Sequence, residues 1–271
     1  MKQFKDKEVL ITGAGSGIGR ATALAFAGRG ARLWLADIDT DGNEHTAKLA
    51  RERGVPARTL KCNVADADSV QAMADQVHAQ IESLDILMNN AGIGSAGRFL
   101  DTTLETWRRV MDINLMGVVH GCHAFLPRMV ARGQGGHVIN TASAAAFIAA
   151  PDMPIYAASK FAVRGFTEAL RGDMAKHNIG VTAICPGIIN TPIVANSIME
   201  GSMDNAERHA KVVNFYQKRN DTPEQVAEVV LEAVRKNVAV QPVSPEAWGM
   251  YLAKRFIPGI IGKLSERELP F

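Results

Sequence analysis

Short apolar runs alternate with segments of helical period along the first two thirds of the chain. Unbroken apolar runs of about five residues are typical of strands buried on both faces, and apolar positions that recur every three or four residues indicate helices. The runs predict strands over 8–12, 32–36, 57–62, 85–89, 136–142 and 180–185. The segments between and after them predict helices over 18–28, 42–52, 67–82, 104–119, 120–132 and 155–177. This alternation predicts an α/β fold, a doubly wound (Rossmann) parallel sheet with helices on both faces and ligands at the carboxyl ends of its strands.

The last third of the chain departs from this rhythm. Residues 192–220 are polar, rich in Met and Asn, and without clean periodicity, which is typical of a lid or a disordered insertion. A helix over 223–236 and a strand over 238–242 then resume the pattern. We predict a single domain over 1–245, with a substrate lid at about 192–220, followed by a C-terminal apolar extension over 246–271.

The C-terminal extension mixes apolar side chains with bases, among them Trp248, Phe256 and Lys254. A stripe of this kind can pack on a neighbouring subunit, close over a pocket, or lie on a membrane surface. Packing on a subunit or as a lid is the commoner outcome, so we favour it over contact with a membrane.

Composition narrows the class of protein. A length of 271 residues suits one α/β unit, and a net charge of +2 gives no reason to expect nucleic acid as a partner. Cys62, Cys122 and Cys185 are scattered, with no CxxC motif or Cys/His cluster, so no metal site is predicted and the thiols suit a reducing compartment. The N-terminus has no apolar signal segment, and no apolar stretch approaches the roughly 20 residues of a membrane helix. We expect a cytoplasmic protein.

A glycine-rich turn follows the first predicted strand. Gly13, Gly17 and Gly19 have the spacing G-x-x-x-G-x-G and lie where the strand meets the first helix. Glycines allow a tight turn and close approach of the backbone, and the helix N-terminus presents free N–H groups to an anion. The turn is therefore a candidate site for the pyrophosphate of a dinucleotide.

The second predicted strand ends at an acid, Asp37, which lies 24 residues after Gly13. A carboxylate at this offset accepts hydrogen bonds from the ribose hydroxyls of NAD and repels the 2′-phosphate of NADP. Ser16 and Ile38 occupy the positions where an NADP-binding chain would carry a base. NAD is therefore favoured over NADP.

Tyr156 and Lys160 lie four residues apart in the predicted long helix, so they share one helix face about one turn apart. A tyrosine with its usual pKa of about 10 is a poor proton acceptor at neutral pH, but a nearby cation lowers that pKa. The pair is a plausible proton-transfer device, although the spacing alone is weak evidence because it arises often by chance.

Together these elements resemble the short-chain dehydrogenase/reductase family, in the branch with the T-G-x-x-x-G-x-G turn. The resemblance covers about residues 5–242 and includes Ser143, which precedes Tyr156 by thirteen positions. Its other motif residues are Asn89-Asn90-Ala91-Gly92, Asn114, Pro186-Gly187 and Thr191. Asn63 departs from the family pattern, which usually has an aspartate there; an asparagine oxygen can still accept a hydrogen bond from the adenine amino group.

The resemblance implies a catalytic role for four residues. Tyr156 would act as the general base in alcohol oxidation and the general acid in ketone reduction, and Lys160 would lower its pKa. Ser143 would donate a hydrogen bond to the substrate oxygen, and Asn114 would hold a water that links Lys160 to solvent. The substrate-binding residues would be Ser143, Ala145, Tyr156 and Ile193. The cofactor-binding residues would be Gly13, Ser16, Gly17, Ile18, Gly19, Asp37, Asn63, Val64, Asn90, Ala91, Gly92, Tyr156, Lys160, Pro186, Gly187, Ile189 and Thr191.

The function predicted from these residues is an NAD(H)-dependent oxidoreductase that interconverts a secondary alcohol and a ketone with an apolar body. Two alternatives stay open, an NADPH-dependent 3-ketoacyl reductase, which Asp37 disfavours, and a non-catalytic dinucleotide-binding regulator, which would not be expected to keep Tyr156 and Lys160. The resemblance also implies a homotetramer or homodimer.

Overall fold

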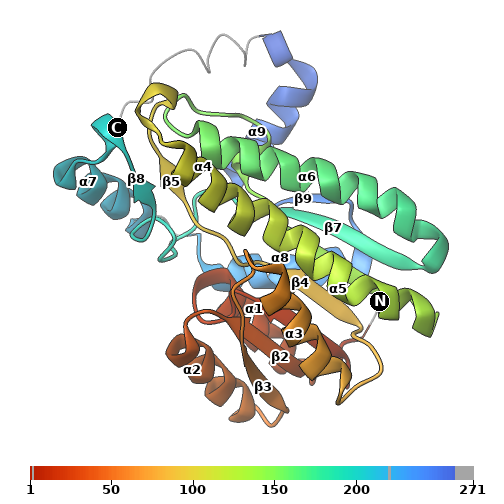
Figure 1. Ribbon diagram of the computed structural model, residues 1–271. Helices are drawn as coiled ribbons and strands as arrows, with labels where there is room; N and C mark the ends of the chain where they lie inside the picture. The colour runs from red at the N-terminus through yellow and green to blue at the C-terminus, as the bar shows by residue number, and fades with distance from the viewer. Residues whose placement is uncertain (2, 219–220, 260–271) are drawn as a thin grey trace.

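The computed structural model describes residues 1, 3–218 and 221–259. Within that part of the chain, seven parallel strands form one sheet in the order β3-β2-β1-β4-β6-β7-β9 (Figure 1). The strands are β1 (Glu8–Thr12), β2 (Arg32–Asp37), β3 (Ala57–Lys61), β4 (Ile86–Asn89), β6 (Gly136–Thr141), β7 (Ile179–Cys185) and β9 (Val240–Pro242). The predicted doubly wound parallel sheet is therefore confirmed.

Alternate residues of the central strands supply two separate cores, because successive side chains of a strand point to opposite faces of the sheet. Leu10 of β1 belongs to one core, whereas its neighbours Val9 and Ile11 belong to the other. The helices that complete the first core are α3 (Ala67–His78), α5 (Gly117–Arg132) and α6 (Pro154–Met174). Those that complete the second are α1 (Gly17–Ala27), α2 (Thr40–Arg51) and α8 (Pro223–Lys236).

The two helices predicted over 104–119 and 120–132 form one nearly continuous rod. The rod comprises α4 (Leu104–Met111), a π-helical turn over Asp112–Met116, and α5. The π turn inserts an extra residue per turn, which rotates the side chains that follow it, and such turns are frequent at functional sites. The sequence pattern placed the start of the second helix at 120, three residues after α5 begins at Gly117.

The described part of segment 192–220 is folded. Ile198–Met199 (β8) pairs in parallel with Ser95–Ala96 (β5), and α7 (Ala206–Gln217) follows. Asn205 caps α7 by accepting hydrogen bonds from the N–H groups of Glu207 and Arg208. The sequence predicted neither β8 nor α7, because both lack a clean apolar period.

The C-terminal extension folds back on its own domain. A helix, α9 (Pro245–Phe256), places the Tyr251 ring 5.2 Å from the Phe147 ring, and Met250 and Tyr251 pack against the first core. The outer side chains Trp248 and Phe256 are exposed. The apolar residues Ile260, Ile261 and Leu264 lie outside the described residues. No helix in the part of the chain that the structure describes is both long and apolar enough to span a membrane.

Candidate active site

The glycine turn joins β1 to α1 at the carboxyl edge of the sheet. Gly13 has a φ of +65°, and a Cβ there would lie 2.8 Å from the Cα of Ala91, so only glycine fits. Gly17 also has a positive φ, +50°. Ser16, the N-cap of α1, is exposed and makes no side-chain cap hydrogen bond, which leaves the first N–H groups of the helix free of a side-chain partner. These features fit the pyrophosphate of a dinucleotide, because a helix N-terminus with free N–H groups binds anions and the glycines allow close approach of the backbone. Ile18 lies in the same first helical turn and is partly exposed.

Asn90 braces this turn. Its Nδ2 donates to the carbonyls of Thr12 and Gly13 at 3.1 and 3.2 Å, and the Thr141 hydroxyl donates to its Oδ1 at 3.3 Å. The N–H groups of Asn90 and Ala91 both donate to the Thr12 hydroxyl. The ends of β1, β4 and β6 are therefore tied together immediately below the turn.

Asp37 ends β2 beside the glycine turn. Its Oδ2 accepts a hydrogen bond from Gly15 N at 2.7 Å, and its Oδ1 accepts one from Asp39 N at 2.9 Å. The guanidinium of Arg20 makes hydrogen bonds within the protein: its Nε donates to Thr46 Oγ1 at 3.0 Å and its Nη2 donates to the Gly15 carbonyl. A ribose bound across the turn would therefore meet a carboxylate, whereas the guanidinium beside it is already engaged with protein oxygens.

Two predicted cofactor-binding residues, Asn63 and Val64, follow β3, and Asn63 is the one expected to meet the adenine. Asn63 is exposed, and its Oδ1 accepts a hydrogen bond from Ala65 N at 3.2 Å. Val64 is buried, and its carbonyl lies 3.0 Å from His120 Nδ1. Both lie at the same carboxyl edge of the sheet as Asp37.

Ser143, Tyr156 and Lys160 are placed by the end of β6 and the start of α6. Ser143 caps a short 3-10 helix, Ala144–Ala146, by accepting a hydrogen bond from Ala145 N at 3.1 Å. Tyr156 lies in the first turn of α6, which Pro154 begins. The Nζ of Lys160 donates to the Thr141 carbonyl at 2.9 Å and lies 5.8 Å from the centre of the Tyr156 ring.

Asn114 lies in the π turn and is fully buried. Its Oδ1 accepts a hydrogen bond from Ile93 N at 2.8 Å, and its Nδ2 donates to Ile93 O at 3.0 Å and to Ser159 Oγ at 3.1 Å. A Cβ built on Gly92 would lie 3.1 Å from Asn114 Oδ1 and 3.4 Å from Lys160 Nζ, so both polar atoms border the space above this glycine. The turn thus brings Asn114 to the same spot as Lys160.

The expectation that the protein itself lowers the pKa of Tyr156 is wrong. Burial raises the pKa of Tyr156 to about 12, although its hydrogen bond with Ser143 acts in the opposite direction. Burial also lowers the pKa of Lys160 from 10.5 to about 8, because the ammonium loses its hydration. Desolvation thus outweighs the hydrogen bond from Ser143 at the tyrosine.

The loop after β7 borders the site from the other side. Ala144 N donates to the Pro186 carbonyl at 2.7 Å, which joins this loop to the residue after Ser143. Gly187 follows, and Ile189 is buried in the second core, with 4% of its surface exposed. A Cβ on Gly17 would lie 3.4 Å from Thr191, so the far end of the loop lies against the glycine turn. Of the residues predicted for the substrate, Ala145 and Ile193 are partly exposed.

Several residues that shape this region were not found from the sequence. Thr12 and Thr141 tie the strand ends, Ser159 joins Asn114 to α6 by donating to the Tyr156 carbonyl at 2.8 Å, and Glu246 contacts the loop after β7. Their signal is tertiary, since each bonds to a residue distant in the sequence or to a backbone group. Among the described residues, no group of three or more His, Cys, Asp or Glu could hold a metal ion.

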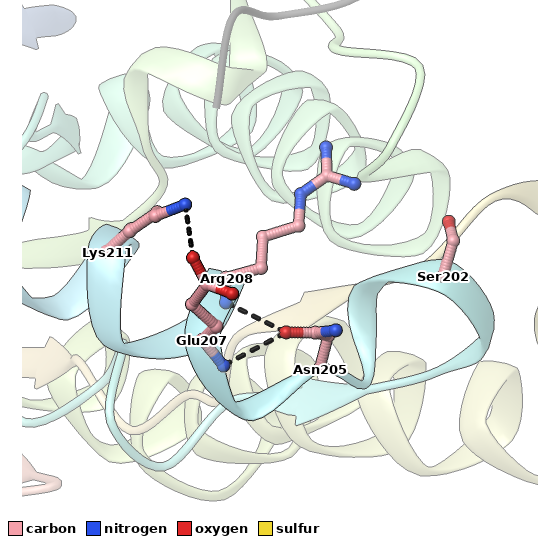
Figure 2. A pocket seen from close by; sticks show the side chains of 5 residues that line it. All are labelled: Ser202, Asn205, Glu207, Arg208 and Lys211. Atoms are coloured by element: carbon pink, nitrogen blue, oxygen red, sulfur yellow. Dashed lines mark hydrogen bonds and ion pairs between the residues drawn. The ribbon is translucent and has the colours of Figure 1, made fainter.

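A separate polar cavity of about 260 Å³ lies beside α7 (Figure 2). It is lined by Ser202, Asn205, Glu207, Arg208 and Lys211. Its charged groups already pair, because Lys211 Nζ lies 2.7 Å from Glu207 and Arg208 Nη2 lies 3.7 Å from the buried Asp152. None of the predicted site residues lines this cavity, so it is distinct from the candidate active site.

Comparison with known proteins gives consistent results. A family model described as short chain dehydrogenase matches residues 7–200. The chain is 42% identical over 259 residues to the probable oxidoreductase EphD of Mycobacterium tuberculosis (strain ATCC 25618 / H37Rv), a match that covers 94% of the chain and 44% of EphD. The chain thus spans less than half the length of that relative.

Two further matches extend over most of both proteins. The cyclohexanol dehydrogenase of Acinetobacter sp. (strain SE19) is 34% identical over 230 residues, with 84% of this chain and 87% of that protein covered. A short chain dehydrogenase/reductase from Burkholderia phymatum in complex with NAD has a TM-score of 0.88 and 28% identity, over 100% of this chain and 98% of that chain.

Proposed function

The chain belongs to the short-chain dehydrogenase/reductase family of oxidoreductases, and we propose that it uses NAD(H) to interconvert a secondary alcohol and a ketone. The observation that carries the proposal is the convergence of Ser143, Tyr156 and Lys160 at the end of β6, beside the glycine turn and Asp37. NAD, when bound, supplies the acceptor or donor of the hydride.

The proposed roles follow from the atoms at the site. In alcohol oxidation, Tyr156 accepts the hydroxyl proton of the substrate, and in ketone reduction it returns a proton to the carbonyl oxygen. Ser143 donates a hydrogen bond to that oxygen and stabilises the charge that develops on it. The ammonium of Lys160 favours the phenolate of Tyr156, and Asn114 holds a water beside Lys160.

The raised pKa of Tyr156 sets a requirement for this mechanism. A phenol with a pKa of about 12 does not ionise near neutral pH, so additional positive charge must act during turnover. The cationic ring of oxidised NAD is the source that the proposal supplies, because Lys160 is already present in the protein whose burial raises this pKa.

The preference for NAD rests on Asp37. Its carboxylate lies 2.7 Å from Gly15 N, at the place where a 2′-phosphate would bring a second negative charge. The Burkholderia phymatum structure in complex with NAD is in line with this choice.

We propose that the substrate has an apolar body. The side chains that border Ser143 and Tyr156 in the proposal are Ile93, Ala145 and Ile193, which are apolar and partly exposed. Cyclohexanol, named for the Acinetobacter relative, is a secondary alcohol of this kind.

Residues 192–218 are proposed as the lid over the substrate-binding part of the site. Ile198 N donates to Gly94 O at 3.0 Å and Glu200 N donates to Ala96 O at 3.0 Å, so the segment lies along residues 93–97. Arg208 of α7 and Arg98 both lie near the buried carboxylate of Asp152, at 3.7 and 3.4 Å, which joins the segment to the loop that precedes α6.

We propose that the protein forms a homodimer or homotetramer. Leu104, Met116 and Phe161, which lie on α4, the π turn and α6, are exposed and offer apolar surface to a second copy. Light scattering coupled to gel filtration measures the mass in solution, and a monomer at micromolar concentration would contradict the proposal.

The decisive experiment is a screen of secondary alcohols with NAD⁺ and NADP⁺, followed by the absorbance of the reduced cofactor. We expect turnover with NAD⁺ that the Tyr156→Phe variant reduces by at least about a thousandfold while NADH binding stays near that of the wild type. Tyr251→Phe, which keeps the ring against Phe147, serves as the matched control and should retain activity. Retention of most activity by Tyr156→Phe would show that the proton-transfer residue is misassigned.

The same screen tests the cofactor. Asp37→Ser should lower the preference for NAD⁺ over NADP⁺ by tenfold or more, on the order of one charged contact. A wild-type enzyme that strongly prefers NADP⁺ would refute the argument from Asp37.

A further inference from the structure

The loop Pro186–Ile188 is held from two sides. On one side, Ala144 N donates to the Pro186 carbonyl at 2.7 Å, next to Ser143. On the other, the carboxylate of Glu246 accepts a hydrogen bond from Ile188 N at 2.9 Å, across 58 positions of sequence. The loop is therefore connected both to the residue beside the proposed oxyanion donor and to the first turn of α9.

Gly187 shows how close this second contact is. A Cβ on Gly187 would lie 2.6 Å from Glu246 Oε1 and would collide with Ser244 Oγ. Ser244 is itself buried, with 2% of its surface exposed, and it caps α9 by accepting a hydrogen bond from Ala247 N. The start of α9 therefore packs directly on the loop, with no room for a side chain between them.

The start of α9 is also anchored to the sheet. Pro242 of β9 is paired with Cys185 of β7, and Val243 N donates to the Cys185 carbonyl at 3.2 Å. At the other end of α9, Tyr251 packs on Phe147. Both ends of α9 are therefore held by contacts with the rest of the domain, and these contacts position the Glu246 carboxylate next to Ile188 N.

We infer that Glu246 is a positioning residue for the cofactor, acting through Pro186–Ile188; this inference rests on the proposed function and on the cofactor-binding role that the family resemblance implies for Pro186 and Gly187. Glu246 lies outside residues 7–200, the part that the family model matches. Without its acceptor, Ile188 N loses a charge-assisted hydrogen bond and the loop populates other conformations. Cofactor affinity then falls in proportion to the fraction of molecules that keep the binding conformation.

The chain offers a matched control. Helix α8 begins Thr222-Pro223-Glu224 and α9 begins Ser244-Pro245-Glu246, so Glu224 has the same position relative to its helix start. Glu224 is exposed. A carboxylate in the first turn stabilises a helix, and replacement of either glutamate by alanine removes that stabilisation. Only Glu246→Ala also removes the hydrogen bond with Ile188 N.

The test measures NADH binding by fluorescence titration, and KM for NAD⁺ and kcat with an alcohol substrate, for the wild type, Glu246→Ala, Glu246→Gln and Glu224→Ala. We expect Glu246→Ala to weaken NADH binding and raise KM for NAD⁺ by about tenfold, with kcat changed less than twofold. Glu246→Gln keeps an oxygen acceptor for Ile188 N and should restore binding to within about threefold of the wild type. Glu224→Ala should bind NADH like the wild type.

Each other outcome is informative. Wild-type affinity in Glu246→Ala, equal weakening in Glu224→Ala, or failure of Glu246→Gln to restore binding would overturn the positioning role. If Glu246→Ala does not fold, the glutamine variant still decides, because it retains the proposed hydrogen bond. Failure of the wild type to bind either NADH or NADPH would instead refute the proposed function, which separates the two failures.

Discussion

Replacement of Lys160 by methionine should make the protein more stable at neutral pH while abolishing the proposed activity. Lys160 is an ammonium with 3% of its surface exposed, in contact with the Thr141 carbonyl at 2.9 Å. Burial lowers its pKa from 10.5 to about 8. The folded state still carries this charge at pH 7, but it holds the proton less tightly than the unfolded chain does.

The size of the effect follows from the two pKa values. Keeping the ammonium charged at pH 7 costs about 3 kcal/mol relative to the unfolded chain, since each pKa unit corresponds to roughly 1.4 kcal/mol. Methionine removes that cost and also removes the hydrogen bond to Thr141, a loss of about 1 kcal/mol. We expect Lys160→Met to raise the free energy of unfolding by about 2 kcal/mol at pH 7.

The pH dependence gives the sharper test. Between pH 8 and 10.5 the unfolded chain holds the lysine proton and the folded protein has lost it, so the wild type becomes more stable as pH rises through this window. The advantage of Lys160→Met should therefore shrink above pH 8 and be nearly gone at about pH 9.5. Urea denaturation followed by circular dichroism, at pH 7 and pH 9.5 without cofactor, measures both values.

Two results would refute this reasoning. One is a Lys160→Met variant that is less stable than the wild type at pH 7; the other is a stability difference that does not change with pH. The control is Lys176→Met, in which the replaced side chain is 70% exposed and pairs with Asp173 at 3.8 Å. That variant should change stability by less than about 0.5 kcal/mol at either pH.

Two further predictions concern buried ionisable groups. Burial lowers the pKa of His137 to about 3, so the folded protein does not take up the proton that the unfolded chain binds below pH 6.5. Between pH 7 and 5, the free energy of unfolding of the wild type, measured by urea denaturation, should therefore fall by about 2 kcal/mol more than that of His137→Gln. Equal losses in the two proteins would refute this assignment. Asp85 lies 3.0 Å from Lys7 and 3.2 Å from Arg132, and it accepts a hydrogen bond from the Glu8 N–H, so Asp85→Asn should lower the free energy of unfolding by about 3 kcal/mol without changing NADH affinity. A shift of less than about 1 kcal/mol would show that the charge contributes little.

The sheet was the most predictable part of the molecule. Its six longest strands are within two residues of the predicted bounds, because a strand buried on both faces leaves an unbroken apolar run such as Val9–Ile11 or Ile86–Met88. The glycine turn was equally predictable from the sequence. Gly13 must accept a φ of +65° against the Cα of Ala91, which no other residue does without strain.

The segments that border the substrate were the least predictable. Residues of α7 are partly exposed and its first turn is polar, so no apolar stripe marks it. The π turn that contains Asn114 adds a residue to one turn of the helix, and no residue pattern in the sequence marked it. The apolar residues of the C-terminal extension predict burial against some apolar surface, and the contact of Tyr251 with Phe147 identifies that surface as the chain's own domain.

The sequence by itself determined the strands, the glycine turn, the acid at the end of β2 and the spacing of Tyr156 and Lys160, because each of these depends on residues close together in the chain. The tertiary structure decided what those residues experience. It buries Tyr156 and Lys160, so that desolvation reverses the pKa direction expected for the tyrosine. It also brings Glu246 to Ile188 N, a contact between segments 58 residues apart. Desolvation and long-range contact depend on how the whole chain packs, and no local pattern of residues records them.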